Sequence, residues 1–215
     1  MTDLARTETI IAIESAISGG SLSLWSKGSE IDCWIGEGGV SRAEDLLPNI
    51  AELLTRNAIP REMVGGIAVS IGPGSFTGIR IGIATALGLK DALRIPVTGV
   101  SVLEAIAFDG SSGCALAAVP MGRDAICYQA FDLTATGPVT IFGPVASRSV
   151  PDEIIDLNCQ RAIVHGSIIQ FVQDEIPAIQ VKSTGLNLAG HIARAAMVPA
   201  IRKSLEPLFL SLAAG

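Results

Sequence analysis

One order of strand-like and helical segments occurs twice along this 215-residue chain, and it constrains the fold more than any other feature. In the first half, three strand-like runs precede a helical pattern, a buried strand at 65–71, a long helical pattern, and a short strand with a third helix. After the glycine- and serine-rich stretch at 109–113, three strands, a helix, a strand at 162–167 and a helix follow again. Strands interleaved with helices predict an α/β protein with mixed sheets. We therefore expect two lobes of one architecture, with residues 1–109 in the first and 110–215 in the second.

Composition excludes several classes of protein. Hydrophobic residues make up 49% of the chain and the net charge is −6, so a disordered chain and a basic nucleic-acid-binding surface are both disfavoured. No apolar run is long enough to span a bilayer, and the first ten residues lack the pattern of a secretory signal. The expected location is the cytoplasm, without a membrane. Any contact with RNA is expected to be indirect.

The residues that commonly bind metals are few and badly spaced. None of the four cysteines forms a C-x-x-C pair, and the two histidines, His165 and His191, fit no H-x-x-x-H pattern. We expect no metal site and four reduced, buried thiols, which are Cys33, Cys114, Cys127 and Cys159.

The stretch "IGPGSFTGIR" at residues 71–80 is the strongest candidate functional loop. It fails the spacing of a Walker A loop, because Ile79 stands where a lysine is required, and that of a dinucleotide-binding loop, because Thr77 stands at the last glycine. Backbone amides at the start of the following helix could still bind an anion. In the structural alternative, the glycines supply unusual backbone angles and Ser75 or Thr77 caps the helix.

The helix after this loop carries two non-polar sides. Small residues recur every four positions at Gly78, Gly82 and Ala86, and a neighbouring apolar stripe contains Ile79, Ile83 and Leu87. One side is expected to pack on the sheet. We expect the small-residue ridge to meet another helix at an interface, so that a bulky residue at Gly82 would disrupt association before folding.

The run "GIAVSIGPGSFTGIRIGIATALGLKDALRIPVTGVSVLEAIA" closely resembles the bacterial TsaB family, also called YeaZ. "IIAIESA", "LLPNIAELL", "AIVHGS" and "LEPLFL" match later and earlier landmarks of that family more weakly. The loop residues that carry the motif are Gly72, Pro73, Gly74, Ser75, Phe76, Thr77 and Arg80.

The resemblance implies a duplicated fold like that of actin, Hsp70 and sugar kinases (the ASKHA fold). It implies a non-catalytic scaffold or activator that dimerises, through helices of its first lobe, with TsaD. TsaD is the homologue that transfers threonylcarbamoyl to adenosine 37 of tRNA. The ATPase TsaE would join the pair, and the chain alone would form a competing homodimer. No cofactor is expected to bind tightly, and an adenine nucleotide at the partner interface is left open.

Departures from the ATP-using relatives favour a protein that is not an enzyme. Glu14 stands where they have an aspartate; Pro120 stands where a second acid is expected, with Asp124 displaced from that place. The end of the chain also departs, with Phe209 in place of a usual tyrosine. Three alternatives remain: an ATP-dependent small-molecule kinase, a metallopeptidase-like enzyme of the M22 type, and an interaction module that acts on cell-wall or growth proteins.

Overall fold

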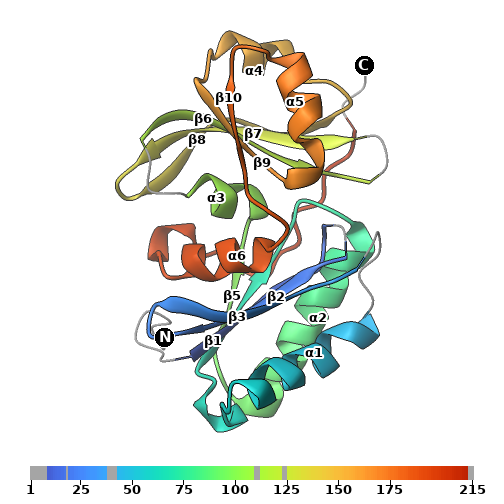
Figure 1. The fold of residues 1–215 in the computed structure, drawn as a ribbon, viewed down its shortest axis with the longest axis vertical. Coiled ribbons are helices and arrows are strands. Elements are labelled where there is room, and N and C mark those ends of the chain that lie inside the picture. The colour runs from blue at the N-terminus through green and yellow to red at the C-terminus, as the bar shows by residue number, and fades with distance from the viewer. Residues whose placement is uncertain (1–8, 18, 38–42, 109–111, 123–124, 213–215) are drawn as a thin grey trace.

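The structure is a computed structural model that describes residues 9–17, 19–37, 43–108, 112–122 and 125–212. Two lobes are stacked along the longest axis, with the first half of the chain below and the second half above (Figure 1). Each lobe contains one mixed five-stranded sheet, with strand orders β3-β2-β1-β4-β5 and β10-β9-β6-β7-β8. The predicted two-lobed α/β architecture is therefore confirmed.

The first lobe begins with an antiparallel meander and continues with parallel strands. Its elements are β1 (Thr9–Glu14), β2 (Ser21–Ser26), β3 (Ser29–Ile35), α1 (Ala43–Arg56), a 3-10 turn (Arg61–Met63), β4 (Gly66–Ser70), α2 (Phe76–Leu93), β5 (Val97–Val100) and α3 (Val102–Ala107). The central strands β1 and β4 are buried throughout, as parallel strands covered on both faces must be. Pro48 lies inside α1 and does not begin it, and the predicted cap Ser41 lies outside the described residues.

The second lobe repeats the same order. Its elements are β6 (Gly113–Pro120), β7 (Ile126–Thr134), β8 (Gly137–Ser147), α4 (Asp152–Asp156), β9 (Arg161–Val164), α5 (Ile169–Glu175), β10 (Gln180–Ser183) and α6 (Leu188–Ala196), with 3-10 turns at Gly166–Ile168 and Pro199–Ile201. The sequence pattern missed α5 and β10, which are short. With them, both halves read strand, strand, strand, helix, strand, helix, strand, helix.

The last helix of each half packs against the sheet of the other half. Helix α3 contacts β6, β7 and β9, whereas α6 contacts β1, β2, β4 and β5. Both helices lie between the two sheets (Figure 1). One hydrophobic cluster consequently mixes residues of both halves, among them Ile10, Leu103, Phe131 and Ile192. The two lobes therefore share one core, although the predicted division of the chain falls between residues 109 and 110.

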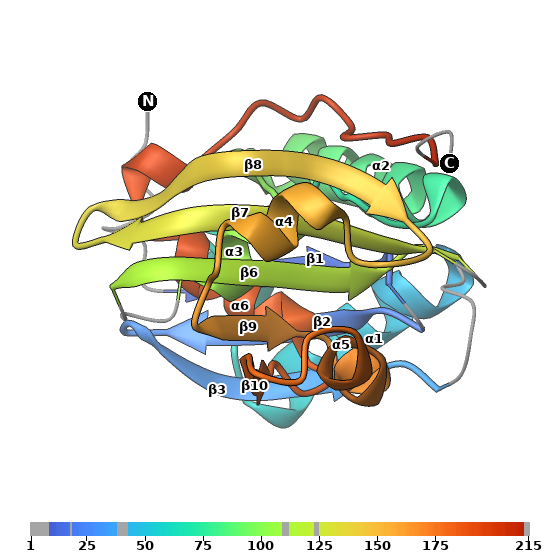
Figure 2. The same cartoon turned by 90° about the horizontal axis from the view of Figure 1, so that it is seen from above.

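The segment after α6 returns across both lobes as a strap, which we define as residues 202–212. Lys203 forms a β-bridge with Gly99 of β5, and Leu212 forms one with Ala146 of β8. Between them, the Leu208 amide donates to the Ile71 carbonyl at 2.7 Å. Seen from above, this segment runs beside α2 and β8 (Figure 2). The strap therefore links the second lobe to the loop that follows β4.

The cysteine prediction is wrong for two of the four residues. Cys114 at the start of β6 and Cys159 before β9 form a disulfide, with their Cα atoms 4.9 Å apart. Cys127 is a buried free thiol, as expected, whereas Cys33 is a free thiol that is only half-buried. The sequence alone did not reveal this pair, because the two residues lie 45 positions apart. They meet only because strands β6 and β9 lie side by side in the sheet.

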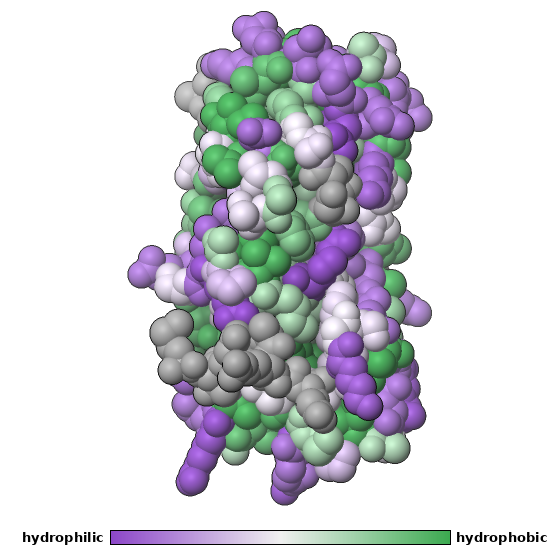
Figure 3. All heavy atoms as spheres, turned by 90° about the vertical axis from the view of Figure 1, so that its left-hand side faces the viewer, coloured by the Kyte–Doolittle hydropathy of each residue, from purple (hydrophilic) through white to green (hydrophobic). Residues whose placement is uncertain are grey.

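Among the described residues, no helix combines the length and the apolar character needed to cross a membrane. On the face drawn in Figure 3, hydrophobic and hydrophilic atoms alternate over short distances.

Candidate partner-binding surface around helix α2

The glycine-rich loop is built to turn β4 sharply into α2. Gly72 and Gly74 have φ angles of +102° and +155°, in the region that favours glycine. A Cβ on Gly72 would lie 2.9 Å from the Leu208 carbonyl oxygen, and one on Gly74 would lie 2.7 Å from Ala16. The loop is thus enclosed by the hairpin after β1 on one side and by the strap on the other.

The backbone amides of this loop are largely occupied by the protein itself. The Ser75 amide donates to the Ala16 carbonyl at 2.8 Å, and the Gly72 amide donates to Ser70 Oγ at 3.1 Å. The Gly78 amide donates to Ser75 Oγ at 3.3 Å, so Ser75 is the helix cap that the sequence allowed. Thr77 is exposed instead. These three amides already have acceptors within the protein and are not free to bind an anion.

The small-residue ridge of α2 packs inside the chain. The five residues predicted for the partner interface are all buried within the lobe: Gly78, Ile79, Gly82, Ile83 and Ala86. Ser15 Oγ donates to the Gly78 carbonyl at 2.8 Å, and a Cβ on Gly82 would collide with the same Oγ. The ridge exists so that the hairpin after β1 can approach the helix. Buried in this way, these residues have little surface left for a partner.

The opposite side of α2 faces outward and is largely exposed. Along it lie Phe76, Thr77, Arg80, Ala84, Leu87, Gly88 and Asp91, all exposed. A Cβ on Gly88 would have no atom within 4 Å, and the Leu87 side chain is 38% exposed. We call this set the outer face of α2. Ala84 and Gly88 repeat the small-residue spacing four positions apart, a signal that the sequence interpretation overlooked.

An aromatic group stands at the start of the outer face. The rings of Phe76 and Phe209 lie 4.6 Å apart, and the Arg80 guanidinium carbon lies 4.3 Å above the Phe76 ring. Both rings remain exposed, at 52% and 43%. The strap thereby adds Phe209 to a surface that otherwise belongs to the first lobe. Aromatic and arginine side chains are the residues that most often dominate binding energy at protein interfaces.

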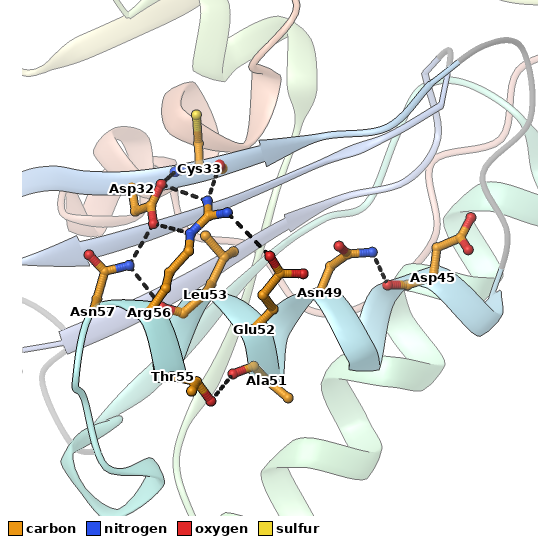
Figure 4. A network of polar contacts seen from close by, with 10 residues as sticks. All are labelled: Asp32, Cys33, Asp45, Asn49, Ala51, Glu52, Leu53, Thr55, Arg56 and Asn57. Atoms are coloured by element: carbon orange, nitrogen blue, oxygen red, sulfur yellow. Dashed lines mark hydrogen bonds and ion pairs between the residues drawn. The ribbon is translucent and has the colours of Figure 1, made fainter.

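Helix α1 lies beside α2 on the same face of the sheet (Figure 1). Its Leu47 side chain is 52% exposed. The far end of α1 is tied to β3 by Arg56, which makes ion-pair contacts with Asp32 and donates to the Cys33 carbonyl at 2.8 Å (Figure 4). Asn57 adds a bond to Asp32 at 2.6 Å. These bonds from Arg56 and Asn57 lower the pKa of Asp32 to about 2 and hold α1 in place.

The acid at the end of β1 is turned inward. Glu14 is 1% exposed, and its carboxyl accepts hydrogen bonds from the amides of Ala16 at 2.6 Å and Ile17 at 3.1 Å. Burial raises its pKa to about 8 despite these two donors. Glu14 therefore organises the hairpin between β1 and β2, and its carboxyl is engaged by its own backbone.

Other candidate catalytic groups are likewise engaged or scattered. His165 Nδ1 lies 2.8 Å from Ser167 Oγ, and His191 Nε2 donates to the Thr184 carbonyl at 3.2 Å. In the part of the chain that the structure describes, no three His, Cys, Asp or Glu residues are grouped so as to hold a metal ion. Pro120 ends β6, and Asp124 lies outside the described residues.

Sequence comparison relates part of this chain to proteins of tRNA modification. Residues 40–131 match the TsaD family, described as tRNA N6-adenosine threonylcarbamoyltransferase. The tRNA threonylcarbamoyladenosine biosynthesis protein TsaB of Escherichia coli is 34% identical over 98 residues, which cover 46% of this chain and 42% of that protein. Over that part of its length, the chain is similar to the TsaB (YeaZ) family. The chain covers less than half of that relative's length.

Solved structures confirm the fold of this chain. YeaZ from Pseudomonas aeruginosa superposes with a TM-score of 0.69 at 23% identity, covering 94% of this chain and all of that one. An inorganic polyphosphate/ATP-glucomannokinase from Arthrobacter superposes with a TM-score of 0.51 at 14% identity, over 88% of this chain and 97% of the kinase. The duplicated fold of the actin, Hsp70 and sugar-kinase type is therefore confirmed.

Proposed function

We propose that this protein is a non-catalytic subunit that binds a TsaD-type transferase in the biosynthesis of threonylcarbamoyladenosine in tRNA. The observation that carries the proposal is the outer face of α2, an exposed helix side with Ala84 and Gly88 at its centre and Leu87 beside them. Small residues allow a second helix to approach closely, so that dispersion contacts form along its length. The aromatic group at Phe76 stands at the start of this face, and the neighbouring helix α1 also carries an exposed Leu47 side chain.

The absence of catalysis is part of the proposal, and it is supported by Glu14. An acid that coordinates a nucleotide-bound metal must present its oxygens to the cleft. Glu14 instead accepts two bonds from its own hairpin and favours its neutral form near pH 7. A small-molecule kinase or a peptidase of this family would need another acid or metal ligand set for the same task.

The test is complex formation between this chain and TsaD from the same organism, measured by size-exclusion chromatography with light scattering. We expect a stable mixed complex with the unaltered protein. Ala84→Arg and Gly88→Leu should abolish it, because a large side chain fills the space that a partner helix would need. The chain's own fold leaves room at both positions, since a Cβ on Gly88 has no neighbour within 4 Å and Ala84 is exposed.

A matched control is Glu153→Leu, which adds the same side chain to an exposed position on α4 of the other lobe. It should bind TsaD like the unaltered protein. Normal complex formation by both α2 variants would overturn the proposed interface. TsaE added to the pair should shift it to a larger species, and clear ATP turnover by this chain alone would contradict the non-catalytic assignment.

The same outer face would be shared by a homodimer, so we propose that self-association and TsaD binding exclude each other. Labelled homodimer mixed with TsaD should exchange into the mixed complex. A homodimer that stays intact within that complex would show that the two use different surfaces.

A further inference from the structure

A pocket of about 360 Å³ lies between the lobes, beneath the strap, and the proposed function makes no use of it. Its size is at the lower end of the range for small-molecule sites. The polar groups that line it include Ser101, Glu104, Gln129 and Lys203. Ile71, Pro144, Pro207 and Leu208 supply non-polar walls.

Ser101 is a buried hydroxyl with nothing to bind in the described chain. It occupies the N-cap position of α3, yet its side chain makes no capping hydrogen bond. The residue is 5% exposed, and its Oγ has no hydrogen-bond partner among the described residues. Burying an unpaired hydroxyl is costly, so this group points to a partner that arrives from the pocket.

Glu104, three residues further on, presents a second unpaired oxygen. Its Oε1 accepts from Lys203 Nζ of the strap at 3.1 Å, whereas its Oε2 is buried with no hydrogen-bond partner among the described residues. Residues three apart on a helix lie on the same side. Ser101 and Glu104 therefore offer two neighbouring oxygens to one ligand.

The charges around the pocket select the kind of ligand. An anion would meet the carboxylates of Glu104 and Glu206, against the single ammonium group of Lys203. A cation on Glu104 Oε2 would crowd the Lys203 ammonium, which already holds the other oxygen of that carboxylate. A neutral hydroxyl donor avoids both conflicts.

We propose that this pocket binds a small neutral molecule with two adjacent hydroxyl groups. One hydroxyl donates to Glu104 Oε2 and its neighbour exchanges a hydrogen bond with Ser101 Oγ. The carbon skeleton lies against the non-polar walls, and the strap closes one side. Adjacent hydroxyls of this kind occur both in free sugars and in the ribose of a nucleoside, and the experiment below separates these sources.

The test compares matched ligands by NMR titration of the full chain. Cis-1,2-cyclohexanediol should bind at least several-fold more tightly than cyclohexanol, which has the same ring and a single hydroxyl. Glucose, and adenosine beside 2′,3′-dideoxyadenosine, then report the source of the diol. Ser101→Ala and Glu104→Gln should each weaken diol binding by about threefold to tenfold, the effect of one lost hydrogen bond.

Glu153→Gln serves as the control, because it removes a charge at an exposed position of α4, outside the pocket lining, and should leave diol binding unchanged. The melting temperature of Ser101→Ala should not fall, since the serine makes no capping bond. Should Glu104→Gln prove unstable, Ser101→Ala and the pair of cyclohexane ligands still decide the question. Equal binding of both cyclohexane ligands, no binding of any diol, or a preference for methylammonium or phosphate would each overturn the proposal.

Discussion

The two sides of α2 can be told apart by adding one methyl group to each. Gly82 and Gly88 lie in the same helix six residues apart, and neither has a positive φ angle. Replacing either by alanine should gain about 1 kcal/mol from helix propensity alone. Any difference between the two variants therefore reports what surrounds each position.

At Gly88 nothing lies within 4 Å of the new Cβ, so the propensity gain should be kept. In a domain of this size, about 1 kcal/mol corresponds to a rise in melting temperature of about 2–4 °C. At Gly82 the new Cβ would collide with Ser15 Oγ and lie 3.5 Å from Val69 Cγ2. Moving the serine would break its 2.8 Å bond to the Gly78 carbonyl, which costs about 1 kcal/mol, and overpacking adds about 1–3 kcal/mol.

The net expectation for Gly82→Ala is a loss of about 1–3 kcal/mol, hence a melting temperature several degrees below that of the parent. The assay is thermal unfolding followed by circular dichroism, at a protein concentration low enough to populate the monomer. Both variants should still bind TsaD, because a methyl group at position 88 is small. A Gly82→Ala protein as stable as Gly88→Ala, but unable to associate, would refute the burial of the ridge and restore it as an interface.

Three further predictions follow from polar and aromatic contacts. The pKa of Glu14 is about 8 in the folded protein, and its ordinary value is 4.5. The contribution of this group to stability should therefore be greatest below pH 4.5 and should decline as the pH rises towards 8. Glu14→Gln should abolish that decline in thermal melts measured between these pH values. Asp32 has the opposite sign, with a folded pKa of about 2, so Asp32→Asn should lower the melting temperature at neutral pH, and the deficit relative to the parent should shrink as pH falls from 3.8 towards 2. Phe209→Ala should leave the fold intact, because the ring is 43% exposed, but weaken TsaD binding by about tenfold; an unchanged affinity would remove the strap from the interface.

Local sequence determined the elements and their order. Apolar strands such as β1 and β4, the cap at Ser75 and the turn at Gly72 and Gly74 follow from residue type and spacing, which act over a few positions. The same pattern in both halves predicted two similar lobes. Short elements with few apolar residues, such as β10, were missed because periodicity needs several turns or strand positions to be recognised.

Only the tertiary structure decided which surfaces are free. Helix α2 has small residues on two sides, and its sequence does not say whether Gly82 or Gly88 faces the sheet; the position of Ser15, 67 residues before Gly82, decides it. Residues far apart in the chain are likewise joined where α3 and α6 pack against the sheet of the other half and where the strap crosses both lobes. The pairing of Cys114 with Cys159 is a third such contact. Such contacts depend on how complete elements pack, and burial changes even the charge preference of Glu14, which no local pattern contains.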